Sequence, residues 1–533
     1  MTPRGNLLTA HDSPWHRLEG TRIFEAAELG LAVPRAEFRE QEPILRKRLL
    51  DAQARLREAG FPVLVLFGGV DGAGKGETAN VLSEWMDPRR IVTRSFGTPS
   101  EEEGERPEHW RFWRDLPPRG YLGVFLSAWY SRPLLDRAYE NIDAAEFDAR
   151  LDKIVALEKM LADDGALIVK FWMHLGREQQ RRRLQSLEED PLLSWRVTKL
   201  DWKHWRLYDR FIGAAEQLLR RTDAPHAHWT IIEGADPYYR NLTAGRGLLD
   251  ALEQRLAERE AAAAEAAGQA AEPPPAETIT VAEAPAPAPA GGVLAGLDLT
   301  KELDEEEYRS RLKKWQARLN LLHRQARDQK RSMILVFEGW DAAGKGGAIR
   351  RVTAALDARD FEVISIAAPT DEERAHHYLW RFWRHLPRAG RVIAFDRSWY
   401  GRVLVERIEG FAKPAEWERA YDEINEFERL LVDHGTVLAK FWLHITPEEQ
   451  ERRFLARKEI PYKRWKLTAE DWRNRARWTD YERAVEEMMT RTGTEIAPWH
   501  AVPANDKGFA RIAVLKHVCR ELERALERRM NGG

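Results

Sequence analysis

The sequence predicts an α/β fold in two tandem copies, each a parallel β-sheet flanked by helices. Three observations support this prediction. Short apolar runs alternate with longer stretches of helical character, a pattern typical of a parallel sheet covered on both faces. A glycine-rich loop that ends in Gly-Lys directly follows one apolar run. The same loop occurs 270 positions earlier, at Gly69 instead of Gly339, and other motifs recur at that spacing.

The elements of the second copy follow one another along the chain. Residues 305–331 carry apolar side chains at helical spacing, which predicts an amphipathic helix that precedes the sheet. Short runs rich in β-branched and aromatic residues predict strands at 333–337, 361–366, 392–395, 436–443 and 499–502. Polar stretches between them predict helices, notably at 345–356 and 416–434. Residues that bind phosphate are therefore expected at the carboxyl ends of the strands.

A single offset of 270 aligns the two copies without a gap over about 200 residues. The aligned pairs include Trp110 to Arg114 with Trp380 to Arg384, and Lys170-Phe171-Trp172 with Lys440-Phe441-Trp442. A run of Ala, Glu and Pro between the copies cannot bury a core and is typical of a spacer. We therefore expect an N-terminal tail at 1–30, a first domain at 31–258, a linker at 259–297 and a second domain at 298–530.

The composition limits the class of protein. The chain has 533 residues, of which 43% are hydrophobic, so it can bury more than one core. Its net charge of −2 gives no global positive field, and we expect neither nucleic acid nor a membrane as partner. Cys519 is the only cysteine, which excludes an intramolecular disulfide and fits a reducing compartment. With no apolar run long enough to span a bilayer and no secretory signal, a cytoplasmic location is expected.

The loop after the first strand of the second copy predicts a phosphate site. It fits the first seven positions of G-x-x-x-x-G-K-[ST], in which backbone N–H groups surround phosphate oxygens and Lys345 reaches along the phosphate chain. Gly346 replaces the hydroxyl residue that usually helps to hold magnesium, and Asp341 within the loop can supply the missing ligand. A ligand-free turn stabilised by Asp341 is the alternative. The expected phosphate-binding residues of the loop are Gly339, Ala342, Ala343, Gly344 and Gly346.

A second carboxylate follows the predicted strand at 392–395. Asp396 stands at the exit of this strand, where a second magnesium ligand is expected, and Arg397 follows it. The arginine is placed to neutralise charge on a phosphoryl group in transfer. A surface ion pair is the alternative when the motif stands alone. Downstream of a phosphate loop, the functional interpretation is favoured.

Basic residues gather later in the second copy. The cluster contains too few apolar residues to pack well, and it predicts a helical lid that guides a polyanion; a solvated helix face is the alternative. Lys440 lies in an otherwise apolar strand and therefore needs a partner, which is either a phosphate or an acidic neighbour. The cluster consists of Arg452, Arg453, Arg457, Lys458, Lys463, Arg464 and Lys466.

Together these motifs resemble those of the polyphosphate kinase 2 family, and the duplication resembles its two-domain branch. The resemblance rests on Glu338 to Gly346, Ala368 to Thr370, Trp380 to Trp383, Phe395 to Arg402 and Lys440 to Ile445. It implies a P-loop kinase fold, dependence on Mg²⁺ with Mn²⁺ as a substitute, and transfer of the terminal phosphoryl group of inorganic polyphosphate to AMP, forming ADP.

The resemblance also implies roles for residues of the second copy. Asp341 and Asp396 would hold the metal, and Lys345 and Arg397 would bind the phosphoryl group in transfer. Further phosphate contacts would come from Arg402, Lys440, Arg453, Arg457 and Lys458.

The first copy keeps the loop but loses its partners. Leu126 and Ser127 stand where the second copy has Asp396 and Arg397, and the basic lid is replaced by an acidic run at 187–191. We therefore expect this copy to be inactive and to pack on the second as a subunit would. Its loop could still hold a phosphate at a regulatory site, and homo-oligomerisation stays open.

Three other functions compete with this hypothesis. Polyphosphate-dependent phosphorylation of nucleoside diphosphates and ATP-dependent phosphorylation of nucleoside monophosphates would use the same loop. The third alternative is a nucleotide-sensing module without turnover. The basic lid and the aspartate within the loop favour polyphosphate, and the complete set of residues in the second copy argues against a sensor.

Overall fold

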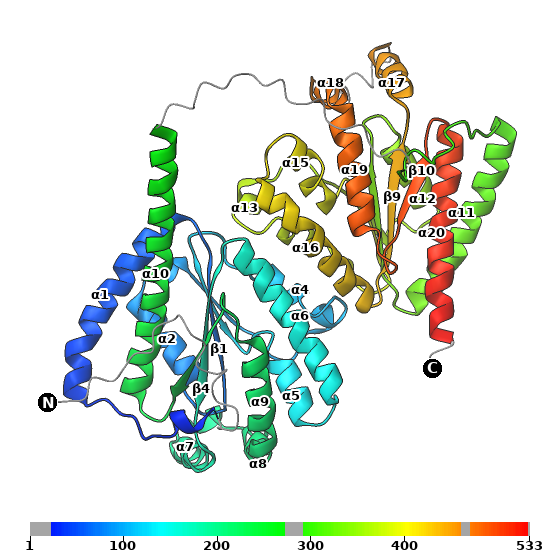
Figure 1. Cartoon of the computed structure of the whole chain (residues 1–533). Coiled ribbons are helices and arrows are strands. Elements are labelled where there is room, and N and C mark those ends of the chain that lie inside the picture. The colour runs from blue at the N-terminus through cyan, green and yellow to red at the C-terminus, as the bar shows by residue number, and fades with distance from the viewer. Residues whose placement is uncertain (1–22, 272–291, 460–468, 531–533) are drawn as a thin grey trace. The chain divides into compact units, whose positions relative to one another are not determined.

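The computed structural model describes residues 23–271, 292–459 and 469–530 (Figure 1). The chain forms two compact units, one of residues 1–98, 115–276 and 375–377, the other of residues 99–114, 277–374 and 378–533. Each unit contains one five-stranded parallel sheet with helices on both faces (Figure 1). The predicted fold class, a duplicated α/β domain with parallel sheets, is confirmed.

The two sheets have the same topology. The first has the order β2-β3-β1-β4-β5 and the second the order β7-β8-β6-β9-β10. Every strand of the second sheet begins and ends 270 positions after its counterpart, and the five strands predicted for it are present with shifts of one or two residues. The strands are β1 (Val63–Gly69), β2 (Ile91–Ser95), β3 (Leu122–Leu126), β4 (Leu167–His174), β5 (Trp229–Glu233), β6 (Met333–Gly339), β7 (Phe361–Ser365), β8 (Val392–Asp396), β9 (Val437–His444) and β10 (Trp499–Pro503).

The helices of the first repeat include a long pair, α1 and α10, that pack side by side against one face of the sheet (Figure 1). α10 continues into the expected linker, because the alanine run at 261–264 has high helix propensity and the first linker proline comes only at Pro273. The helices are α1 (Arg35–Ala59), α2 (Lys75–Trp85), α3 (Glu101–Gly104), α4 (Trp110–Arg114), α5 (Ser131–Ala138), α6 (Ala144–Asp163), α7 (Arg177–Glu189), α8 (Lys199–Arg206), α9 (Tyr208–Thr222) and α10 (Pro237–Ala271).

The second repeat repeats this arrangement, with α11 and α20 as the long pair (Figure 1). The amphipathic helix predicted before the sheet is α11. The helices are α11 (Glu305–Asp328), α12 (Lys345–Thr353), α13 (Asp371–Arg374), α14 (Trp380–Trp383), α15 (Val405–Ile408), α16 (Pro414–Asp433), α17 (Pro447–Glu459), α18 (Ala469–Ala476), α19 (Trp478–Thr492) and α20 (Lys507–Met530).

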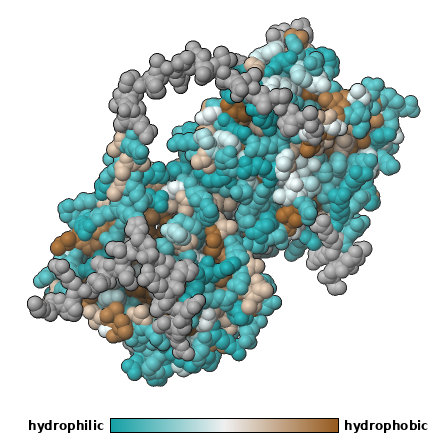
Figure 2. All heavy atoms as spheres, viewed as in Figure 1, coloured by the Kyte–Doolittle hydropathy of each residue, from teal (hydrophilic) through white to brown (hydrophobic). Residues whose placement is uncertain are grey.

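The central strands are buried because helices cover both faces of each sheet. The central strands β4 and β9 are buried at every position, as expected for strands with helices on both faces. Hydrophilic residues cover most of the face seen in Figure 2, and hydrophobic ones form only small patches there. None of the helices described is both long and apolar enough to cross a lipid bilayer.

Each sheet buries one lysine with a carboxylate. Lys440 in β9 is 0% exposed, and its ammonium group donates to Glu428 (2.7 Å), the Tyr400 hydroxyl (2.9 Å) and the Thr492 carbonyl (2.8 Å). An ammonium group has three donors, so all of them are used within the protein. The predicted phosphate contact of Lys440 is therefore wrong, and its partner is the acidic neighbour.

The first repeat contains the same arrangement. Lys170 donates to Glu158 (2.9 Å), the Tyr130 hydroxyl (3.2 Å) and the Thr222 carbonyl (2.7 Å). A contact present in both repeats, including the one that lacks Asp396 and Arg397, belongs to the shared scaffold.

We expect Lys440→Met to lower the free energy of unfolding of its unit by about 3–5 kcal/mol, because Glu428 is left buried without its partner. Urea unfolding monitored by circular dichroism measures this loss. The matched variant Lys170→Met should destabilise the first unit similarly. The double variant Lys440→Met/Glu428→Leu should regain much of the stability; a double variant no more stable than Lys440→Met would contradict this account.

Candidate phosphate-binding site

The loop of the second repeat connects β6 to α12. Gly339 has φ +145°, and a Cβ atom there would lie 2.5 Å from the Leu443 carbonyl oxygen, so only glycine fits. Gly344 has φ +110° and is the N-cap of α12, which directs the free N–H groups of the first helical turn toward the loop. Lys345 Nζ lies over the loop and donates to the carbonyl oxygens of Gly339 (2.7 Å) and Trp340 (3.3 Å).

Asp341 lies within this loop and is paired on both oxygens. Its Oδ1 accepts from Arg397 Nη2 at 2.9 Å, and its Oδ2 accepts from Asn474 Nδ2 at 3.2 Å. Burial raises the pKa of the Asp341 carboxyl, but Lys345 and Arg397 outweigh burial and keep the pKa below its usual value. The carboxylate is therefore ionised at neutral pH.

Asp396 ends β8, the strand beside β6. It pairs in register with Phe337, two residues before Gly339, which brings its side chain level with the loop. A Cβ atom on Gly346 would lie 3.9 Å from Asp396 Oδ2, so the carboxylate faces the position where phosphate loops usually carry a hydroxyl residue. Within the described part of the chain, no group forms a hydrogen bond or ion pair with this carboxylate. The structure thus places Asp396 beside the loop that contains Asp341.

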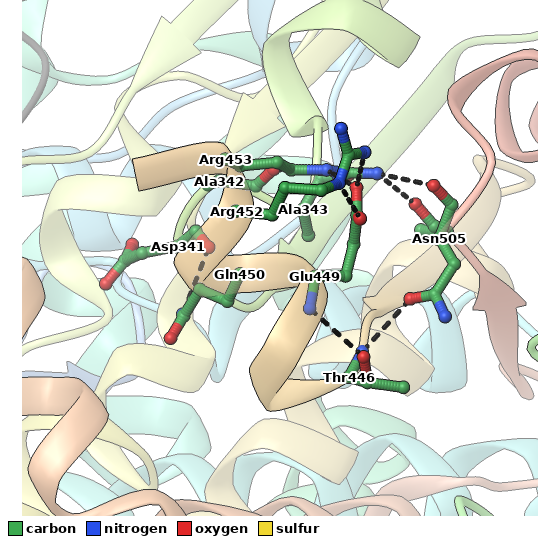
Figure 3. A network of polar contacts seen from close by, with 10 residues as sticks. Asp341, Ala342, Ala343, Thr446, Glu449, Gln450, Arg452, Arg453 and Asn505 are labelled. Carbon is green, nitrogen blue, oxygen red and sulfur yellow. Dashed lines mark hydrogen bonds and ion pairs between the residues drawn. The ribbon is translucent and has the colours of Figure 1, made fainter. Parts of the chain in front are cut away.

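The segment after β9 holds the loop in place (Figure 3). Arg453, at the second turn of α17, is 4% exposed. Its Nη1 donates to the carbonyl oxygens of Ala342 and Ala343, both at 2.9 Å, and its Nε pairs with Glu449. Its Nη2 donates to the carbonyl oxygens of Ala504 (2.7 Å) and Asn505 (2.8 Å).

These contacts use all five donors of the Arg453 guanidinium. The predicted phosphate contact of Arg453 is therefore wrong, since the side chain binds the back of the loop instead. Gln450 adds to the same support, because its Nε2 donates to the Asp341 carbonyl at 3.1 Å (Figure 3). Arg453 and Gln450 are thus positioning residues for the loop.

For the remaining basic residues, the predicted phosphate contacts are not tested by the structure. Arg402 forms an ion pair with Glu406 (3.1 Å) and stacks its guanidinium 4.5 Å from the centre of the Tyr378 ring, and its phosphate contact stays a prediction. The side chains of Arg457 and Lys458 lie outside the described residues. The predicted lid runs from Arg452 to Lys466; its first part belongs to α17, and its residues from 460 onward, with Lys463, Arg464 and Lys466, lie outside the described residues.

Sequence reasoning missed a buried pair beside the loop. Ser398 Oγ donates to Glu338 Oε1 at 2.8 Å, and burial raises the pKa of the Glu338 carboxyl. Their counterparts in the first repeat are Gly68 and Ala128, so this pair is absent where Asp396 and Arg397 are also absent. A position-by-position comparison at the offset of 270 would have identified it.

The first repeat keeps the loop, with Asp71 and Lys75, but not the charged pair at the exit of the adjacent strand. Lys75 Nζ donates to the carbonyl oxygens of Gly69 (2.7 Å) and Val70 (2.9 Å), as Lys345 does in its own loop. At the end of β3, Ser127 has φ +53°, close to the +65° of Arg397. The strand exit is therefore conserved in shape, while its charged side chains are lost.

A phosphate loop on the central strand of a parallel sheet, with a carboxylate on the adjacent strand, defines a P-loop phosphotransferase domain. The family model for polyphosphate kinase 2 matches residues 33–260 and 302–530. The chain belongs to the polyphosphate kinase 2 family.

Several relatives match most of the chain along most of their own length. A polyphosphate:AMP phosphotransferase of Pseudomonas aeruginosa is 49% identical over 507 residues, covering 95% of this chain and 100% of the relative. A protein of the same name from Acinetobacter johnsonii is 36% identical over 468 residues, covering 86% and 91%. A crystal structure from Pseudomonas aeruginosa, described as a polyphosphate kinase 2, has a TM-score of 0.83 and 47% identity, covering 95% and 99%.

We expect Arg453→Met to loosen the loop, because it leaves buried carbonyl oxygens without a donor at a cost of about 1–3 kcal/mol. Amide hydrogen exchange of residues 340–346 should become faster. Arg452→Met is the matched control: Arg452 is 70% exposed and pairs with Glu449, so stability should change by less than about 0.5 kcal/mol. Unchanged loop exchange in Arg453→Met would show that the guanidinium does not support the loop.

Proposed function

We propose that this chain transfers the terminal phosphoryl group of inorganic polyphosphate to AMP, forming ADP and a polyphosphate shorter by one unit. The observation that carries the proposal is the loop of the second repeat with both carboxylates beside it, in a chain that matches relatives named polyphosphate:AMP phosphotransferase along their whole length. The catalytic residues of the proposal are Asp341, Lys345, Asp396 and Arg397.

We propose Mg²⁺ as the metal, with Mn²⁺ able to replace it. No group of three or more His, Cys, Asp or Glu side chains that could hold a metal ion occurs in the described ranges. Two carboxylates are nevertheless sufficient, because Mg²⁺ commonly takes one or two carboxylates and completes its shell with water and substrate phosphate oxygens. Asp341 and Asp396 would hold it, and the bound ion would neutralise charge on the phosphate oxygens.

The side chains of the site supply binding and charge neutralisation. The N–H groups of the loop and Lys345 bind the phosphate that is transferred. Arg397 is 43% exposed, and it can exchange its contact with Asp341 for one with the phosphoryl oxygens. An oxygen of the AMP phosphate attacks the terminal phosphorus, and the bond to the next polyphosphate unit breaks. Positioning and charge neutralisation suffice for this reaction, so no covalent enzyme intermediate is needed.

The first repeat takes no part in the chemistry under this proposal. Leu126 and Ser127 offer neither a carboxylate nor a cation, and α7 ends in an acidic run that would repel a polyanion. We propose that this repeat packs on the second as a structural subunit. Association of whole chains and a cytoplasmic location remain predictions.

The donor is tested by incubating the protein with AMP and Mg²⁺, separately with long-chain polyphosphate and with ATP, and following ADP by chromatography. We expect ADP from AMP and polyphosphate, with a matching shortening of the chains. ADP formation with ATP alone would identify an ATP-dependent nucleoside monophosphate kinase. Replacing AMP by ADP or GMP in the polyphosphate reaction then ranks the acceptors.

The active repeat is tested by paired substitutions at equivalent positions. Asp396→Asn and Arg397→Ala should each lower kcat/KM by at least about a hundredfold, because the first weakens a proposed metal ligand and the second removes a positive charge beside the phosphoryl group in transfer. Ser127→Ala, at the position equivalent to Arg397, should leave kcat/KM unchanged. Activity lost in Ser127→Ala and kept in Asp396→Asn would place the reaction in the first repeat.

A further inference from the structure

The loop of the first repeat is surrounded by arginines that converge on one carboxylate. Glu77 lies in the first turn of α2, directly after the loop. Its Oε1 accepts from Arg183 Nη2 at 3.0 Å and from Arg196 Nη1 at 2.8 Å, and its Oε2 accepts from Arg240 Nη2. Three guanidinium groups thus share a single negative charge at the N-terminus of a helix, where a phosphate binds in related loops.

A cavity lies beside two of these guanidinium groups, those of Arg183 and Arg196. Its volume is about 180 Å³, and its remaining lining consists of residues 71–77, Leu184, Leu187 and Asp201. A second cavity of about 280 Å³ lies between α7 and the loop after β5, at Gly234, and Arg183 lines both. Both volumes exceed the roughly 30 Å³ that one water molecule takes up in the liquid, so each cavity has room for a group of about the size of a phosphate.

Arg240 provides an independent indication of a ligand. Its side chain is 5% exposed, yet its buried Nε donates to no group among the residues that the structure describes. A Cβ atom on Gly74 would lie 2.5 Å from this Nε, which places the unused donor against the loop itself. A buried guanidinium N–H without an acceptor is costly, and an anion in the loop would provide one.

This arrangement is not inherited from the catalytic geometry. The positions equivalent to Glu77 and Arg240 in the second repeat are Gly347 and Ala510. Arg183 does have a counterpart, Arg453, but that side chain binds backbone carbonyl oxygens, whereas Arg183 reaches Glu77. The position equivalent to Arg196 is Lys466, which is also basic, so Glu77 and Arg240 are the charges specific to the first repeat.

The charged residues around the loop of the first repeat indicate which class of ligand it would bind. Guanidinium groups match phosphate oxygens in bidentate geometry, and a chain of phosphates carries more charge than the Glu77 carboxylate. The acidic end of α7, with Glu188 and Glu189, disfavours a long polyanion. The ligand is accordingly a short chain of two or three phosphates, free or attached to a nucleoside.

We propose that the first repeat is a non-catalytic binding site for such a short phosphate chain, in which the ligand displaces Glu77 from Arg183, Arg196 and Arg240. Glu77 is then an internal anion that holds the arginines in place when the ligand is absent. Lys75 and the loop N–H groups complete the contacts. Because the site lacks a carboxylate at Leu126, the bound ligand is not turned over.

The test measures binding to the full-length chain by isothermal titration calorimetry. The second repeat is disabled by Asp396→Asn and Lys345→Met, and ADP and tripolyphosphate are titrated separately. In this background Glu77→Gln should tighten binding by about tenfold, because the competing charge is removed. Arg196→Met should weaken binding by about tenfold, because one charge-assisted contact is lost. Arg181→Met is the control on α7, since Arg181 pairs with Glu178 instead of Glu77.

The two titrants distinguish the sources of the phosphate chain. Tighter binding of tripolyphosphate than of ADP identifies a free phosphate chain as the ligand, and the reverse order identifies a nucleotide that also uses the cavity beside Gly234. Either order of affinities supports the proposed site if Glu77→Gln tightens the binding of the titrant and Arg196→Met weakens it. Affinities that are the same in the background, in Glu77→Gln and in Arg196→Met, or heat release that is absent altogether, would overturn the proposal.

Discussion

The parallel pairing of β6 with β8 is the constraint on which the site depends. Phe337 pairs with Asp396, so the loop that begins at Gly339 and the carboxylate that ends β8 emerge at the same edge of the sheet. Side chains alternate between the faces of a strand, so a slip of one residue would turn Asp396 away from the loop. The contact of Asp341 with Arg397, the residue after Asp396, follows from this register.

Comparison of the two repeats distinguishes the contacts that both repeats share from the contacts that only the second repeat has. Several polar contacts occur in both repeats, among them the buried lysine with its glutamate, the loop lysine on its own carbonyl oxygens, and the glutamine that supports the loop aspartate, Gln180 in one repeat and Gln450 in the other. The pair of Glu338 with Ser398 occurs only where Asp396 is present. Since the first repeat folds with the same strands but without this pair, the second repeat does not need it for its fold.

The sequence predicted the strands, the long helices and the loop, because these depend on local pattern and on the rule that parallel strands present their carboxyl ends together. The phosphate contacts predicted for Lys440 and Arg453 were wrong for a physical reason. Both carry positive charge in a phosphate-binding context, but the sequence does not reveal which acceptors fold around a charge. The acceptors of Arg453 are backbone carbonyl oxygens about 110 residues before it and about 50 residues after it, and a carbonyl has no residue-type signature.

The backbone at the end of β3 has the same conformation as the backbone at the end of β8, although the side chains there differ. A non-glycine residue with positive φ costs about 1–3 kcal/mol, and such residues persist where the surrounding structure fixes them. Ser127 has that conformation although it has no guanidinium to place, so the surrounding fold fixes it in both repeats. Glu77 and Arg240 are not part of this shared frame, because the second repeat has Gly347 and Ala510 at those positions. Under the proposed function, in which the first repeat takes no part in the chemistry, these charges are explained by binding, which needs the loop and its positive charge but not a carboxylate at Leu126.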